Sequence, residues 1–281
     1  MISLLLALLT AEPQTREAPP PPACIGATFV SWEACAAAAP EGSPAYVLAM
    51  INLGTQAYMN GDRGAALNFY DKAGEGRQVA SDVILHAFRA DTYRYAGRMD
   101  EARTDAAIAW GYLDGRPPQG LNTLGPRPID DPVRFVVLAS ILPIMKIENA
   151  DFSRAREMFM ALPANDWSAL TRRANVLSEL GEHAGAVADS KRAVDLQPDH
   201  PMLQNNHCYT LVEAGRAAEG LPYCERAVAL APEAAPIRHS IAAALAGMGQ
   251  CAAADRQLAE ARRLEPEANL YRQPIPCTPK G

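Results

Sequence analysis

The sequence predicts an all-α fold built from a repeated pair of helices. Two markers recur with a spacing of 34 residues: a glycine at the end of one amphipathic stretch and a proline at the end of the next. They are Gly181, Gly215 and Gly249, and Pro198, Pro232 and Pro266. This order is typical of a helix, a tight turn, a second helix and a stop. The spacing therefore predicts antiparallel helical hairpins that follow one another along the chain.

Small side chains occur at fixed distances after each turn glycine. An Ala or Gly stands five residues after it, and an Ala stands twelve residues after it. The positions are Ala66, Ala73, Ala102, Ala109, Ala186, Ala193, Gly220, Ala227, Ala254 and Ala261. These offsets lie on one helical face, where small residues allow two antiparallel helices to approach closely. We expect them to form the contact between the two helices of each hairpin, here called the seam.

The repeat unit resembles the tetratricopeptide repeat. INLGTQAYMNGDRGAALNFYDKAGE, residues 51–75, matches the family consensus at Leu53, Gly54, Tyr58, Gly61, Ala66, Tyr70 and Ala73, and RRANVLSELGEHAGAVADSKRAVDLQPDH, residues 172–200, is nearly as close. The resemblance implies a right-handed superhelical solenoid of about six repeats that acts as a protein-interaction scaffold and not as an enzyme. The repeats are expected at 45–78, 80–113, 133–163, 166–200, 201–234 and 235–268.

The remaining segments complete the expected domain organisation. Residues 1–11 are an apolar run that is too short to span a bilayer and fits a signal peptide. A Pro-rich spacer with an N-terminal Cys segment is expected at 12–44, a Pro/Gly-rich loop at 114–132 and a C-terminal tail at 269–281. We therefore expect export to the periplasm or secretion, with no stable membrane span after signal removal. The alternative is a cytosolic adaptor that keeps its apolar N-terminus.

Composition and motifs argue against several classes of function. The net charge of −6 offers no basic stripe for phosphates, so nucleic acid is not an expected partner. No catalytic motif occurs, and Cys208 beside His207 cannot pair with it along a helix, where neighbours point about 100° apart. His200, His207 and His239 lack the helical spacing of metal ligands, so neither a metal nor a cofactor is expected. We expect these histidines to face solvent or the groove.

Six cysteines, an even number, support an oxidising compartment. Cys208 lies seven residues before Gly215 and Cys224 nine after it, so they should stand at the same height on facing helices. A disulfide there is geometrically reasonable, and the alternative is two buried thiols. Proximity alone suggests Cys24 with Cys35 and Cys251 with Cys277. Six cysteines allow 15 pairings, so these pairs are hypotheses.

The concave face of such stacked hairpins is lined by the first helix of each repeat. Positions ten, six and two residues before each turn glycine should line it, and none of them is Lys or Arg. Asp91, Glu148, Glu179 and Glu213 are among them and favour a neutral or basic ligand. The predicted peptide-binding groove consists of Asn175, Glu179, Asn205, Tyr209, Glu213 and His239. The family's chaperone-binding members hold a C-terminal carboxylate with a clamp of Lys, Arg and Asn side chains on this face. Only the amide side chains of that clamp have counterparts here, which argues against that class of partner. A groove that is merely solvated is the alternative.

Overall fold

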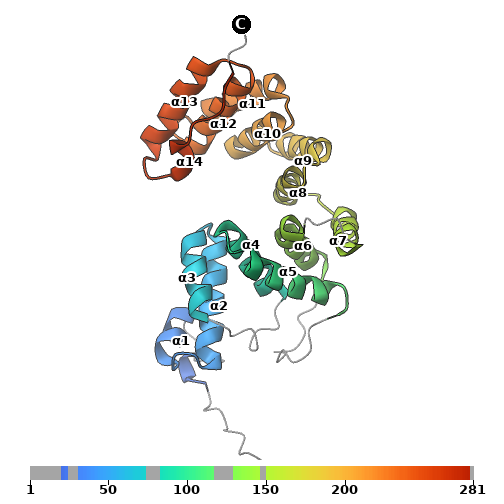
Figure 1. The fold of residues 1–281 in the computed structure, drawn as a ribbon, viewed down its shortest axis with the longest axis vertical. Helices are drawn as coiled ribbons and strands as arrows, with labels where there is room; N and C mark the ends of the chain where they lie inside the picture. The colour runs from blue at the N-terminus through green and yellow to red at the C-terminus, as the bar shows by residue number, and fades with distance from the viewer. Residues whose placement is uncertain (1–19, 25–30, 74–82, 117–128, 146–149, 279–281) are drawn as a thin grey trace, which may run out of the picture. The chain divides into compact units, whose positions relative to one another are not determined.

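The computed structural model describes residues 20–24, 31–73, 83–116, 129–145 and 150–278. Over these ranges the regular structure is helical, and most helices follow one another as antiparallel pairs (Figure 1). The predicted all-α fold of stacked hairpins is thereby confirmed. The proposed signal peptide at 1–11 and positions 117–128 of the expected loop lie outside the described residues.

The chain divides into two compact units at the start of α4, between Leu85 and His86. The first unit holds a short 3-10 helix (Pro22–Cys24), α1 (Trp32–Ala38), α2 (Pro44–Met59) and α3 (Arg63–Ala73). Helices α2 and α3 form the first expected hairpin. Helix α1 was not expected, and it begins where the Ser31 hydroxyl accepts a hydrogen bond from the backbone N–H of Ala34.

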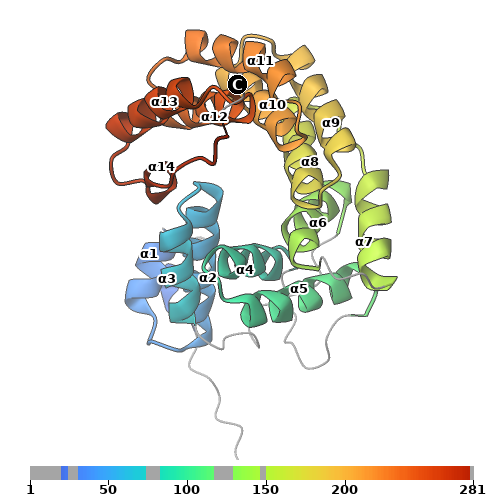
Figure 2. The same cartoon turned by 45° about the horizontal axis from the view of Figure 1, so that its top comes forward.

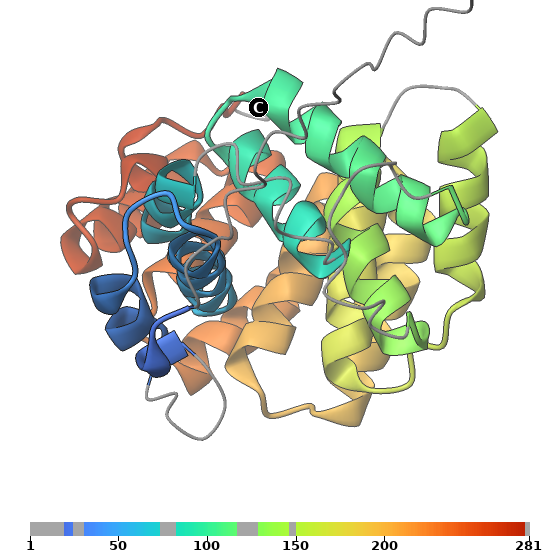
Figure 3. The ribbon, with the colours of Figure 1, turned by 90° about the horizontal axis from the view of Figure 1, so that it is seen from below.

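The second unit holds the other expected hairpins. Its helices are α4 (Val83–Tyr95, from His86 onward), α5 (Met99–Leu113), α6 (Asp131–Met145), α7 (Ala150–Ala161), α8 (Trp167–Glu179), α9 (His183–Leu196), α10 (Pro201–Glu213), α11 (Ala217–Leu230), α12 (Ala235–Gly247), α13 (Cys251–Leu264) and α14 (Asn269–Arg272). Helices α8 and α10 lie on one side of their hairpins and α9 and α11 on the other (Figure 2). The same hairpins lie side by side when seen from below (Figure 3).

The turn glycines explain why the hairpins turn where the sequence predicts. Gly181 has φ of 79° and Gly215 has φ of 73°, a left-handed conformation that favours glycine. In each turn the glycine N–H and the next N–H donate to carbonyls of the preceding helix, for example Gly215 to Val212 at 2.9 Å and Arg216 to Leu211 at 2.8 Å. These bonds close the end of each first helix and reverse the chain.

The seam is packed as the small residues predict. The nine seam alanines are at most 3% exposed. A Cβ added to Gly220 would lie 2.9 Å from the carbonyl oxygen of Cys208 on the facing helix. A Cβ added to Gly54 would lie 2.6 Å from the Tyr70 ring. The helices of these hairpins are therefore too close to admit a larger side chain at these two positions.

Two hairpins of the second unit also carry a buried ion pair that the sequence analysis missed. Arg89 donates to both carboxylate oxygens of Asp105, and Arg173 does the same to Asp189. In each case the Arg stands eight residues before a turn glycine and the Asp eight after it. Burial raises the pKa of Asp105, but hydrogen bonds from His86 and Arg89 outweigh it, and the net pKa is lowered. The pairs join the two helices opposite each other across the hairpin.

The last hairpin is covered by the C-terminal tail. Tyr271 of α14 is 4% exposed and packs in a cluster with Ala235, Ala242, Leu258 and Ala261. Arg262 on α13 donates through Nε to the Tyr271 carbonyl at 2.6 Å. Across the described part of the chain, no helix combines the length and apolarity that a bilayer span requires.

Candidate functional site

A hollow of about 360 Å³ lies in the second unit between α8, α10, α12 and α14. Every residue of the predicted groove lines it: Asn175 and Glu179 on α8, Asn205, Tyr209 and Glu213 on α10, and His239 on α12. Their four-residue spacing on α8 and α10 places them on one helical face. The structure thus brings the predicted residues together, and their role in binding stays a prediction.

Other lining residues were not singled out from the sequence. They are Ser178, Asn206, Thr210, Pro236, Ser240, Leu270 and Tyr271. Most are helical neighbours of the predicted positions, so a wider count along each helix face would have found them. Leu270 and Tyr271 come from α14, beyond the last repeat, and the repeat pattern holds no signal for them.

A positive charge lies next to the groove, although none of its described lining residues is Lys or Arg. Nη1 of Arg94 lies 2.8 Å from Oε2 of Glu179, and Nη2 of Arg94 lies 2.9 Å from Oδ1 of Asp91. Arg94 stands three residues before Gly97, between the counted positions, yet its long side chain reaches α8. Asp91 was expected on the open face but is only 4% exposed. Glu148, the other predicted acid, lies outside the described residues.

Glu213 differs from Glu179 because the described residues provide it with no ion-pair partner. It accepts a hydrogen bond from the hydroxyl of Ser178 on α8. Burial raises the pKa of Tyr209, one helical turn earlier, and the charge of Glu213 raises it further. Glu213 therefore supplies a negative charge to the hollow that no cation offsets within the described part of the chain.

Three rings form part of the lining. The His239 ring lies between Tyr209 and Tyr271, with centroid separations of 6.3 Å and 5.6 Å. Burial lowers the pKa of His239, so the imidazole is neutral at neutral pH. The hollow therefore combines aromatic faces with one uncompensated carboxylate.

Asn205 carries an unused hydrogen-bond acceptor. The residue is 5% exposed, and its Oδ1 is buried without a hydrogen-bond partner among the described residues. Its Nδ2 donates only a long hydrogen bond, 3.4 Å, to Oδ1 of Asn206. A buried unpaired acceptor is costly, and a donor from a ligand would remove that cost.

The other histidines are placed differently from one another. His207 is not in the groove or in solvent, contrary to expectation: it is 3% exposed, with Nδ1 2.8 Å from Oγ of Ser190 and its ring edge-on to Tyr223. The ring of His200 lies 5.4 Å from that of Trp167 and is tilted by 37° against it. Among the described residues, no three His, Cys, Asp or Glu side chains are grouped so as to hold a metal ion.

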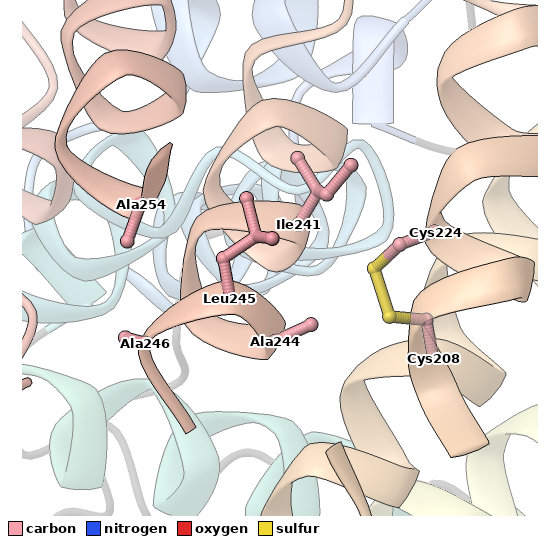
Figure 4. Close-up of a cluster of buried hydrophobic side chains, with 7 residues drawn as sticks. All are labelled: Cys208, Cys224, Ile241, Ala244, Leu245, Ala246 and Ala254. Atoms are coloured by element: carbon pink, nitrogen blue, oxygen red, sulfur yellow. A yellow bond between two sulfur atoms is a disulfide. The ribbon is translucent and has the colours of Figure 1, made fainter. Parts of the chain in front are cut away.

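The structure pairs the cysteines as the sequence suggested. The Cα–Cα distances are 4.7 Å for Cys24 and Cys35, 5.4 Å for Cys208 and Cys224, and 5.6 Å for Cys251 and Cys277. Cys208 and Cys224 bridge α10 and α11 beside the apolar cluster of Ile241, Ala244 and Leu245 (Figure 4). Cys208, the best enzyme candidate of the sequence, is thus joined to a facing helix. The oxidation of these pairs in the cell stays a prediction.

The fold defines a helical-repeat protein, and the comparisons with known proteins agree on this fold. Residues 168–200, which span α8 and α9, match the tetratricopeptide repeat family model. A tetratricopeptide repeat protein from Parabacteroides merdae superposes with a TM-score of 0.57 at 12% identity, over 87% of this chain and 88% of that one. PilW, a type IV pilus biogenesis factor, superposes with a TM-score of 0.50 at 15% identity, over 80% of this chain and 96% of the PilW chain. No curated protein sequence matched. Residues 168–200 thus match a tetratricopeptide repeat, and the chain has the helical-repeat fold of these solved structures.

Proposed function

We propose that this chain is a non-enzymatic scaffold that binds an extended, neutral or basic segment of a partner protein in the hollow between α8, α10, α12 and α14. The observation that carries the proposal is the buried, unpaired Oδ1 of Asn205 in a concave site. An extended peptide presents backbone N–H groups that such an acceptor can bind. Asn175 lines the same hollow and adds a second amide on the neighbouring helix.

The test is a selection of random heptapeptides displayed on phage, carried out on the full chain. We expect peptides to be enriched on the wild type and lost on Asn205→Ala. Asn68, an exposed asparagine on α3 that is not among the lining residues of the hollow, gives the matched control, and Asn68→Ala should keep the enrichment. Circular dichroism and the thermal midpoint establish that both variants are folded. Equal enrichment on both variants would place binding elsewhere.

The scaffold is proposed to work in the periplasm or outside the cell. The apolar run at 1–11 and the pairing of all six cysteines support this location. The alternative remains a cytosolic adaptor with an uncleaved N-terminus. N-terminal sequencing of the protein from fractionated cells separates the two, since an intact Met1 in the cytosolic fraction would contradict export.

A further inference from the structure

We propose that the hollow binds one Lys or Arg side chain of the partner segment, with Glu213 as its counter-ion. The inference rests on the proposed function and adds to it the residue type that anchors the ligand.

The charges around the hollow favour a cation at this particular carboxylate. Glu179 already has Arg94 at 2.8 Å, whereas Glu213 has only the Ser178 hydroxyl. Glu213 is exposed, and a carboxylate without a cation gains more from an incoming ammonium or guanidinium group than one that is already paired. None of the described residues that line the hollow is Lys or Arg, so no side chain of the lining competes for that position.

The rings favour the same ligand. Tyr209 is one helical turn before Glu213 on α10, and its ring is followed by those of His239 and Tyr271. A cation over an aromatic face gains a further attraction, and the methylene stem of Lys or Arg packs on apolar surface. Leu270 and Pro236 supply such surface in the same hollow.

An acidic ligand fits the site poorly. Arg94 forms an ion pair with the lining residue Glu179, and it is already shared between Asp91 and Glu179. An incoming carboxylate would have to displace one of these two acids and would face the uncompensated charge of Glu213. The arrangement therefore selects against the negative ligands that a carboxylate clamp accepts.

Asn205 and Glu213 have separate tasks in this arrangement. They stand two helical turns apart on α10, with Tyr209 between them. Asn205 accepts from the backbone of the segment, which is independent of its sequence, and Glu213 pairs with one side chain, which specifies it. A change at Glu213 should therefore alter which peptides bind, and a change at Asn205 should alter whether any bind.

The experiment repeats the heptapeptide selection in parallel on the wild type, Glu213→Gln and Glu225→Gln. Glu225 is an exposed residue on α11 outside the hollow, so its substitution removes the same charge and serves as the control. We expect a fixed Lys or Arg position among peptides enriched on the wild type and on Glu225→Gln. On Glu213→Gln that position should lose its basic preference while peptides are still recovered.

An enriched peptide is then synthesised with its basic residue intact or replaced by norleucine, which keeps the stem and removes the charge. Fluorescence anisotropy should show that Glu213→Gln weakens binding of the basic peptide by about two- to fivefold and leaves binding of the norleucine peptide unchanged. Equal weakening of both peptides, or enrichment without a basic position, would overturn this inference and leave the proposed function standing. Recovery of no peptide by the folded wild type would overturn the proposed function and this inference with it.

Discussion

Nη1 of Arg94, near the end of α4, lies 2.8 Å from Oε2 of Glu179, near the end of α8, although the two residues are 85 positions apart. The pair ties the second expected repeat to the fourth within one compact unit. It also offsets one of the two carboxylates of the hollow, which leaves Glu213 as the dominant charge for a ligand.

The first prediction is that Arg94→Gln strengthens the binding of a basic peptide. Removing this cation makes the hollow more negative, and glutamine can still hydrogen-bond Asp91. We expect an affinity increase of about two- to fivefold at low ionic strength, which shrinks as salt is added. Fluorescence anisotropy with the enriched basic peptide is the measurement. Arg98, in the turn after α4, pairs with Glu101 and serves as the control. Arg98→Gln removes one positive charge there and should have little effect on the affinity for the peptide. Unchanged affinity in a folded Arg94 variant would contradict this electrostatic view.

The second prediction concerns the seam. Gly220→Ala should destabilise the chain by about 1–3 kcal/mol, because the new Cβ would lie 2.9 Å from the Cys208 carbonyl oxygen. Gly64→Ala on α3 is the matched control, since its Cβ meets only the Asp62 side chain at 3.6 Å. Alanine there should stabilise the chain by about 0.5–1 kcal/mol. Urea denaturation of both variants gives the comparison, and equal shifts in the two would argue against close packing of the α10–α11 hairpin.

The third prediction concerns the bridge between α10 and α11. Replacing Cys208 and Cys224 together with Ala should cost about 3 kcal/mol, because the bridge closes a loop of 16 residues in the unfolded chain. Alanine is preferred to serine because both positions are fully buried. Urea denaturation, with and without reductant for the wild type, measures the loss.

Peptide mass mapping without reductant provides the control for that result. It should find Cys24 with Cys35, Cys208 with Cys224, and Cys251 with Cys277. Free thiols throughout protein recovered from its native compartment would contradict oxidation there and would weaken the case for export.

The fourth prediction is a loss of stability in acid that depends on His207. Burial and, to a smaller extent, the charge of Lys191 lower the pKa of His207 from 6.5 to about 4. Between pH 6.5 and pH 4, His207 is therefore protonated in the unfolded chain but neutral in the folded chain. The free energy of unfolding falls as the pH drops through this range. We expect His207 to account for about 2 kcal/mol of loss between pH 8 and pH 5.

His207→Gln isolates this contribution, because glutamine keeps a partner for Ser190 but does not titrate in this range. Urea denaturation at a series of pH values should show a shallower decline for the variant than for the wild type. Parallel profiles for the two proteins would mean that His207 is protonated in the fold without cost.

The sequence predicted the parts of the fold that repeat. The positive φ at Gly181 and Gly215 and the close approach at Gly220 are fixed by local residue type, and the period reveals them. Helix α1 was missed because it is seven residues long, too short for a periodic pattern. The ion pair of Arg94 with Glu179 was missed because it depends on the approach of the Arg94 side chain on α4 to α8.

The candidate site was predictable in its positions and less so in its chemistry. Counting back from the turn glycines identified Asn205 and Glu213, because helix periodicity fixes which face they occupy. It could not show that Asn205 is buried with an unused oxygen, or that His207 points into the core, since both depend on packing with neighbouring helices. Tyr271 lies outside the repeats, so no period could point to it.

The covering of the last hairpin by the tail also bears on how copies of the protein behave toward one another. In a stacked array, each hairpin offers an apolar face that the next one occupies. At the end of this chain, Tyr271 and Ile275 occupy the face formed by Ala235, Ala242 and Leu258, and Cys277 joins the tail to Cys251. A second molecule would have to displace Tyr271 and Ile275 before its own repeats could stack on this face. The tail thus acts as a cap on α12 and α13, and we expect the chain to resist end-to-end stacking at this face.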